Sequence, residues 1–164
     1  MKKIYSFLTV ILLFTSCNNN NFVDVEKASA EAENFIETQF DFFTNSSLEQ
    51  AKMTFADNAI LIGTDAAEYL TGWEEIEPSV KGQLIIKDPV FTSRNLNIFM
   101  SDDGKMASYT QELDFTYSID GEPGEVKDVR NSGVIKNIEG EWRIIQIHWS
   151  IGLEGQAVEY EIIE

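Results

Sequence analysis

The chain has 164 residues and a formal net charge of −16, with 28 acidic side chains against 12 basic ones. A surface this acidic repels phosphate backbones and anionic headgroups, so nucleic acid is a poor partner, and we interpret the acidity as solubilising. Cys17 is the one cysteine, which excludes an intramolecular disulfide, a CxxC redox pair and a cysteine-based zinc site.

The N-terminus has the pattern of a secretory signal. Two lysines precede an apolar run over residues 4–14, which is too short for a permanent transmembrane helix. The following Phe-Thr-Ser-Cys resembles the bacterial lipobox, with Phe where Leu is usual. The resemblance implies removal of residues 1–16, acylation of Cys17 and attachment to a membrane of the bacterial cell envelope. An ordinary cleaved signal followed by a free thiol is the alternative.

The rest of the chain divides into three parts. Residues 17–23 are polar and low in complexity, which is typical of a tether. Residues 24–152 contain one domain without internal repeats, and residues 153–164 form a C-terminal tail. The length of the domain is enough for a sizeable core.

Helical patterns fill the first part of the domain. Apolar residues at three- and four-residue steps predict one amphipathic helix over residues 25–43. A capping box at Ser46 or Ser47 begins a second helix, which we expect to end at Asp57 and Asn58.

Short elements follow. Residues 59–63 read as a buried strand, and residues 64–72 as a helical turn closed by glycine. The apolar face of residues 73–86 predicts another helix, in which Pro78 begins a new turn or a kink.

After residue 89 the pattern becomes alternating, as in half-buried strands. The predicted strands cover residues 90–100, 105–119, 126–137 and 142–151, with turns at residues 101–104, 120–124 and 138–140. Helices followed by a meander predict an α+β domain with helices on one face of an antiparallel sheet.

This order of elements resembles the SnoaL-like branch of the nuclear transport factor 2-like superfamily. The resemblance is carried by residues 60–76, by the hairpin at residues 101–111, and by residues 130–150. The last stretch fits the pattern Arg-x-Thr, Gly-x-Trp, His-x-Ser, with Ser132 in place of Thr. The resemblance implies a curved sheet wrapped on N-terminal helices into a cone, and a homodimer. Its members include isomerases, cyclases, dehydratases, epoxide hydrolases and domains with no reaction, so function must come from the site.

The turn at residues 138–140 decides which strand face carries His148, the one histidine. A two-residue type I′ turn would place Glu139 at positive φ, so we predict a three-residue turn with positive φ at Gly140 alone. The expected pairs are Arg130 with His148, Ser132 with Gln146, and Val134 with Ile144. We therefore expect a polar or interface cluster on the convex side, where this superfamily often dimerises, made of Arg130, Ser132, Gln146 and His148. A pocket role for His148 is the alternative.

The opposite face is more apolar and is expected to hold the cavity. The candidate pocket residues are Phe55, Tyr69, Trp73, Tyr109, Gln111, Asn131, Ile147 and Trp149. Apolar walls with a few polar groups suit a small, partly hydrophobic ligand, although the same residues also fit a plain core. A carboxylate for isomerase chemistry would come from Asp65 or Glu68, which alternatively are ordinary first-turn helix acids.

We thus expect an exported, membrane-anchored, dimeric domain that binds a small molecule. A lyase or isomerase acting on a hydrophobic substrate is one alternative, and a non-catalytic dimerisation module is the other. No cofactor and no metal site are expected, because HExxH and EF-hand spacings are absent from the sequence.

Overall fold

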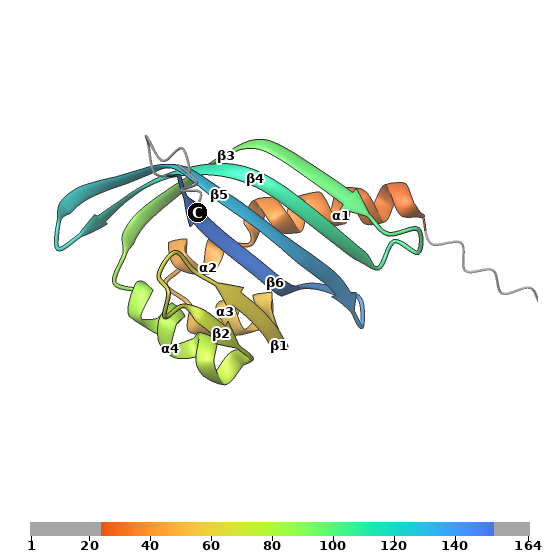
Figure 1. The fold of residues 1–164 in the computed structure, drawn as a ribbon, viewed down its shortest axis with the longest axis horizontal. Helices are drawn as coiled ribbons and strands as arrows, with labels where there is room; N and C mark the ends of the chain where they lie inside the picture. The colour runs from red at the N-terminus through yellow and green to blue at the C-terminus, as the bar shows by residue number, and fades with distance from the viewer. Residues whose placement is uncertain (1–23, 153–164) are drawn as a thin grey trace, which may run out of the picture.

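The computed structural model describes residues 24–152. The predicted signal, the tether with Cys17, and the tail at 153–164 lie outside the described residues. The domain is an α+β fold in which a curved sheet arches over the helices, as predicted (Figure 1). Its elements are α1 Val25–Thr38, α2 Asp41–Thr44, α3 Leu48–Thr54, β1 Phe55–Ile62, β2 Tyr69–Thr71, α4 Trp73–Gln83, β3 Lys87–Met100, β4 Met106–Ile119, β5 Glu122–Ile138 and β6 Glu141–Ile151.

The sheet is mixed rather than fully antiparallel. Its strand order is β2-β1-β6-β5-β4-β3, and β1 runs parallel to β6, with Leu61 opposite Ile147 and Ile62 opposite His148. Strands β3 to β6 form the predicted antiparallel meander. Strand β1, which comes from the helical part of the chain, pairs with β6, the last strand of the meander. This pairing brings the loop after β1 beside the end of β6.

The predicted single helix over residues 25–43 is wrong in its last part, because α1 ends at Thr38 and α2 begins at Asp41. The buried side chain of Gln39 lies at the break and donates to the Ile36 carbonyl at 2.8 Å. It thereby gives a hydrogen-bond donor to a carbonyl at the end of α1, where the last carbonyls of a helix have no N–H partner within the helix. The change of direction turns Phe40, Phe42 and Phe43 into the core, where all three are buried.

Two further helix predictions need correction. Ser47 caps α3 by accepting from the Gln50 N–H at 3.2 Å, but the helix ends at Thr54 and not at Asp57–Asn58. Residues 64–72 form a loop and the edge strand β2 rather than a helical turn. The polar and small residues of this segment offer no apolar stripe for a helix to bury, and Gly72 ends β2 at a φ of 78°. Pro78 lies inside α4, which is continuous from Trp73 to Gln83.

The turn of the last hairpin also differs from the prediction. Glu139 and Gly140 form a two-residue turn with φ of 55° and 96°, so Ile138 pairs with Glu141. A bulge at Ile145 then shifts the pairing. The observed partners in the upper part are Arg130 with Ser150, Ser132 with His148, and Val134 with Gln146, which corrects all three predicted pairs. Ile144 pairs with Ile135 and is buried.

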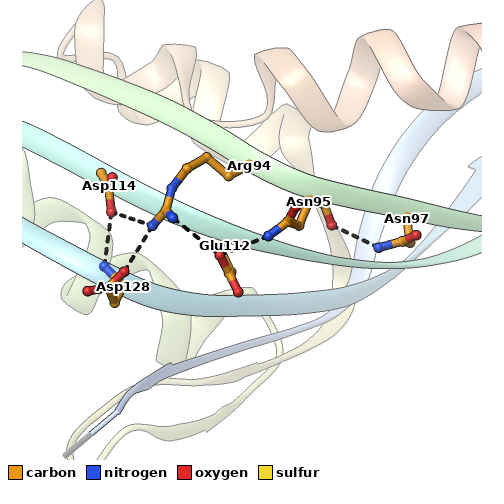
Figure 2. Close-up of polar contacts among 6 residues, drawn as sticks. All are labelled: Arg94, Asn95, Asn97, Glu112, Asp114 and Asp128. Carbon is orange, nitrogen blue, oxygen red and sulfur yellow. Dashed lines mark hydrogen bonds and ion pairs between the residues drawn. The ribbon is translucent and has the colours of Figure 1, made fainter. Parts of the chain in front are cut away.

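Two bulges bend strands β3 and β5 near Arg94. Asn95, with φ of 52°, interrupts the pairing of β3, and Asp128, with φ of 55°, interrupts that of β5. Arg94 lies between the two bulges (Figure 2). Its guanidinium is 2.9 Å from Asp114, 3.0 Å from Asp128 and 3.4 Å from Glu112. Because a bulge bends its strand and increases the local twist, the two bulges contribute to the curvature of the sheet, and Arg94 bridges the strands between them.

Candidate functional site

An apolar cavity of about 330 Å³ lies between the curved sheet, α2 and the end of α4. Its size falls at the lower end of the range of small-molecule pockets. The strands contribute Leu61, Pro89, Phe91, Phe115, Val126, Val129, Trp149 and Ile151, and the helical half with its loops contributes Phe43, Gly63, Thr64, Glu68, Gln83 and Ile86. The cavity therefore has mostly apolar walls, with polar side chains on the loop after β1 and at the end of α4.

Aromatic rings pack side by side along the cavity wall. The Phe91 ring lies 5.4 Å from Phe115 and 6.1 Å from Phe43, centroid to centroid. Behind them Phe40 lies 5.0 Å from Phe91 and 4.9 Å from Trp149, so it ties β3 to β6 through the start of α2. Such tilted pairs are favourable geometries for aromatic rings, and they give the wall a fixed shape.

Glu68 is held in place by the loop between β1 and β2. The Gly63 N–H donates to the Glu68 carbonyl at 2.8 Å, and the Glu68 N–H donates to the Asp65 carbonyl at 3.0 Å. The Asp65 N–H donates to the Glu68 carboxylate at 3.2 Å. The side chain of Glu68 lies so close to Gly63 that a Cβ there would come 2.6 Å from the Cβ of Glu68. Glycine at position 63 is thus what lets the carboxylate fold back over the loop.

A row of hydrogen-bonded polar side chains is buried in the sheet, away from the cavity lining. Ser93 donates to Gln111 at 2.7 Å, Gln111 donates to Asn131 at 2.9 Å, and Asn131 donates to the His148 carbonyl at 3.2 Å. Gln111 and Asn131 are buried. Their hydrogen-bonding groups are engaged with one another across β3 to β6, which stabilises the sheet and leaves them off the cavity wall.

Of the eight candidate pocket residues, Trp149 lines the cavity. Gln111 and Asn131 belong to the row of buried polar side chains just described. The other five have different places: Phe55, Tyr109 and Ile147 are core residues, Trp73 packs against Phe55, and Tyr69 is exposed on the edge strand β2. The predicted apolar face of the sheet is therefore the inner one, but the cavity lies at another position along it.

The predicted polar cluster lies on the outer face of the sheet. Ser132 and His148 pair directly, with Arg130 and Gln146 on the neighbouring outward positions of β5 and β6. A shallow depression of about 360 Å³ includes Arg130, Ser132 and His148, together with Asn97 and Thr110 from β3 and β4. His148 is thus separated from the apolar cavity by the thickness of the sheet.

The sequence interpretation missed several cavity residues. Phe91 and Phe115 are partners across β3 and β4, and both alternate inward, a signal that was present in the sequence. Phe43 reaches the cavity because the helix breaks before it. Gln83 reaches it from the end of α4, and Ile86 from the segment between α4 and β3. Those placements depend on tertiary packing, which periodicity alone does not reveal.

Neither a metal cluster nor a membrane span is found in the described part of the chain. Residues 24–152 contain no group of three or more His, Cys, Asp or Glu side chains arranged to hold a metal ion. No helix within the same range is long and apolar enough to cross a membrane.

Solved structures with the same architecture were found by comparison. A nuclear transport factor 2-like superfamily protein from Salmonella enterica serovar Typhimurium has a TM-score of 0.69 at 17% identity, covering 82% of this chain and 99% of its own. A protein from Xanthomonas campestris assigned as a calcium/calmodulin-dependent protein kinase II association domain has a TM-score of 0.68 at 22% identity, covering 76% and 87%.

A protein from Novosphingobium aromaticivorans assigned as a scytalone dehydratase has a TM-score of 0.66 at 12% identity, covering 77% of this chain and 85% of its own. At these identities the likeness shows a shared fold. No curated protein matches the chain by sequence. The SnoaL-like domain family matches residues 32–154, which is most of the chain. The chain belongs to the SnoaL-like domain family and has the cone-shaped fold of the nuclear transport factor 2-like superfamily.

Proposed function

We propose that this protein binds a small, partly hydrophobic molecule in the cavity between its sheet and helices. The observation that carries the proposal is an apolar cavity of about 330 Å³ that the side chains of the described residues leave unfilled. The cavity is partly open to solvent and its walls are mostly apolar, with a few polar side chains, which is typical of small-molecule sites. The cavity thus favours ligand binding over the purely structural alternative.

A thermal-shift screen of the purified protein against a broad metabolite library tests this proposal. A ligand that binds the folded state alone stabilises it by about 2.7 kcal/mol at a hundredfold excess over its dissociation constant. Val126→Phe narrows the cavity and should abolish a hit, whereas Val25→Phe, on an exposed position of α1, should keep it. A library without hits, or hits that survive Val126→Phe, would favour the structural reading.

A lyase or isomerase is the second candidate, because one carboxylate, Glu68, lines the cavity. General acid–base chemistry needs such a group within hydrogen-bond reach of the substrate. His148 faces the other side of the sheet, so Glu68 would have to act without it. Any screened ligand can be incubated with the protein and followed by mass spectrometry. Turnover that is lost in Glu68→Gln supports the enzyme, and an unchanged ligand supports a binding protein.

Export and membrane anchoring through Cys17 complete the proposal. They are supported by the sequence, in which a basic start and an apolar run lead to a lipobox-like Phe-Thr-Ser-Cys. More than one acyl chain would hold the protein firmly on a membrane. Cys17→Ser should move the protein from the membrane fraction to the soluble fraction. Continued membrane association of this variant would contradict the lipid anchor.

The outer face of the sheet is the surface on which we place a homodimer. It carries exposed Phe99 and Met106 beside small hydroxyl and amide side chains, among them Ser132 and Thr110. A partner copy on this face would bury the exposed rings and side chains of Phe99 and Met106, which supports the placement. In the same arrangement, His148 is an interface residue rather than a catalytic one.

A further inference from the structure

The part of the cavity lining that residues 24–152 form contains one ionisable side chain, and it is an acid. Glu68 stands among apolar residues and the neutral polar side chains of Thr64 and Gln83. Lysine, arginine and histidine are missing from the lining formed by residues 24–152. A carboxylate or phosphate ligand would therefore meet no cation there and would lose its hydration without compensation.

The position of Glu68 is fixed before any ligand arrives. The Asp65 N–H donates to its carboxylate at 3.2 Å, and the backbone hydrogen bonds of the loop hold the residue over Gly63. None of the ion pairs formed among residues 24–152 includes Glu68. The structure therefore presents a preorganised carboxylate at the polar end of an apolar cavity.

The remaining walls suit the apolar part of a ligand. Phe91, Phe115 and Trp149 line the cavity, and their rings offer a large apolar contact area. The net charge of −16 raises the local concentration of cations around the whole protein. We propose that the cavity selects a small apolar amine, whose ammonium group pairs with Glu68 while its apolar part packs against the aromatic wall. The inference rests on the proposed ligand-binding function and specifies its ligand class.

Calorimetric titration of the full-length protein with three matched probes tests the inference. Phenylpropylamine, phenylpropanol and phenylpropanoate share one apolar part and differ in the charge of the head group. We expect the amine to bind about tenfold more tightly than the alcohol, equivalent to ~1.4 kcal/mol, and the acid to bind least. High salt should reduce the preference for the amine, because Glu68 is only half-buried.

Two variants with the same change of charge identify the responsible carboxylate. Glu68→Gln keeps an acceptor for the Asp65 N–H and should abolish the preference for the amine. Asp65→Asn keeps the acceptor for the Ala67 N–H, lies outside the cavity lining and should leave the preference unchanged.

The outcomes separate the two proposals. Equal binding of amine and alcohol would overturn the amine inference and leave ligand binding intact, as would a library ligand that binds when none of the three probes does. A preference that persists in Glu68→Gln, or disappears equally in Asp65→Asn, would overturn the role of Glu68. Failure of the probes and of the library together would overturn both proposals.

Discussion

The Tyr109 hydroxyl donates to the Gln39 side-chain carbonyl at 2.7 Å, and this hydrogen bond joins the inner face of β4 to the break between α1 and α2. Both side chains are buried, and Gln39 also donates to the Ile36 carbonyl. The bond fixes the place where the chain leaves α1. It thereby sets the direction in which Phe43 enters the cavity wall.

Tyr109→Phe should destabilise the protein, because it leaves the buried Gln39 oxygen without its donor. The expected loss is about 1–3 kcal/mol of unfolding free energy, the usual cost of an unsatisfied buried polar group. Urea denaturation at neutral pH measures it. A loss within experimental error would show that another donor, such as a water molecule, reaches the Gln39 oxygen.

Tyr109→Phe should also change how the free energy of unfolding depends on pH. Burial raises the pKa of Tyr109 well above its ordinary value of 10.0, so the folded state keeps the phenol neutral after the unfolded state has begun to ionise. The contribution of Tyr109 is thus complete below pH 10 and is lost progressively as the pH rises above it, by up to ~1.4 kcal/mol per pH unit. The Phe variant should show a shallower alkaline decline, and equal slopes would contradict the prediction.

The helix break illustrates what local pattern cannot show. Residues 25–43 keep a helical repeat of apolar side chains, so the sequence predicts one helix. The break is stabilised by Tyr109, 70 positions further along the chain from Gln39. A contact of that range is tertiary, and it overrides the local propensity.

In the last hairpin, two departures from the prediction offset each other: the shorter turn at Glu139 and Gly140, and the bulge at Ile145. A positive φ is unfavourable for a residue with a side chain, so the sequence predicts none at Glu139, yet Glu139 has a φ of 55° in the structure. The bulge at Ile145 then restores the alternation. His148 consequently lies on the outer face, as expected from the sequence, although its partner is Ser132 and not Arg130.

For the site, the sequence identified the inner face but not the position of the cavity along it. Tyr109 and Ile147 point inward as expected, but they are packed in the core. The cavity forms around Phe91 and Phe115, beyond the bulges at Asn95 and Asp128. Because bulges depend on interactions between strands, a reading of each strand by itself could not place it.

Gly133 is predicted to tolerate no larger residue. It lies opposite Tyr109, and a Cβ there would come 2.7 Å from the Tyr109 ring and 2.8 Å from the Gln146 carbonyl. Gly133→Ala should cost about 1–3 kcal/mol, as expected for an overpacked core. Thermal denaturation measures the loss.

Gly82→Ala is the matched control for that substitution. Gly82 lies in α4, and a Cβ there would meet nothing within 4 Å. Alanine should stabilise the helix by about 0.4–1 kcal/mol, so the same chemical change should have opposite signs at the two sites. Equal effects at positions 82 and 133 would contradict the steric explanation.

Arg94→Gln should loosen the bend of the sheet. The variant removes the cation between Glu112, Asp114 and Asp128, and leaves three carboxylates close together. The Asp128 N–H, which donates to Asp114 at 2.9 Å, should exchange its hydrogen faster. Lys27→Gln, which removes the exposed ion pair with Glu31 on α1, should leave that exchange rate unchanged.

The decrease of the free energy of unfolding at acid pH gives a second measure of the same ion pairs. The hydrogen bond from the Asp128 N–H and the nearby Arg94 guanidinium lower the pKa of Asp114 below its ordinary value of 3.8. Its contribution is therefore present above pH 3.8 and is lost as the pH falls through the lower folded-state pKa. In Arg94→Gln the decline on acidification should be smaller, and an unchanged acid limb would exclude a role for Arg94.

The proposed dimer should depend on the outer face of the sheet. Phe99 is 65% exposed on β3, and Phe99→Asp places a charge where a partner copy would bury the ring, so analytical ultracentrifugation should show monomers. Ile85→Asp is the control, because Ile85 is 61% exposed in the segment between α4 and β3 and should leave the dimer intact. His148→Ala should weaken the dimer more than it weakens ligand binding, because the sheet separates it from the cavity. A monomeric wild type would contradict the dimer, and loss of ligand binding in His148→Ala with an intact dimer would move His148 into the binding site.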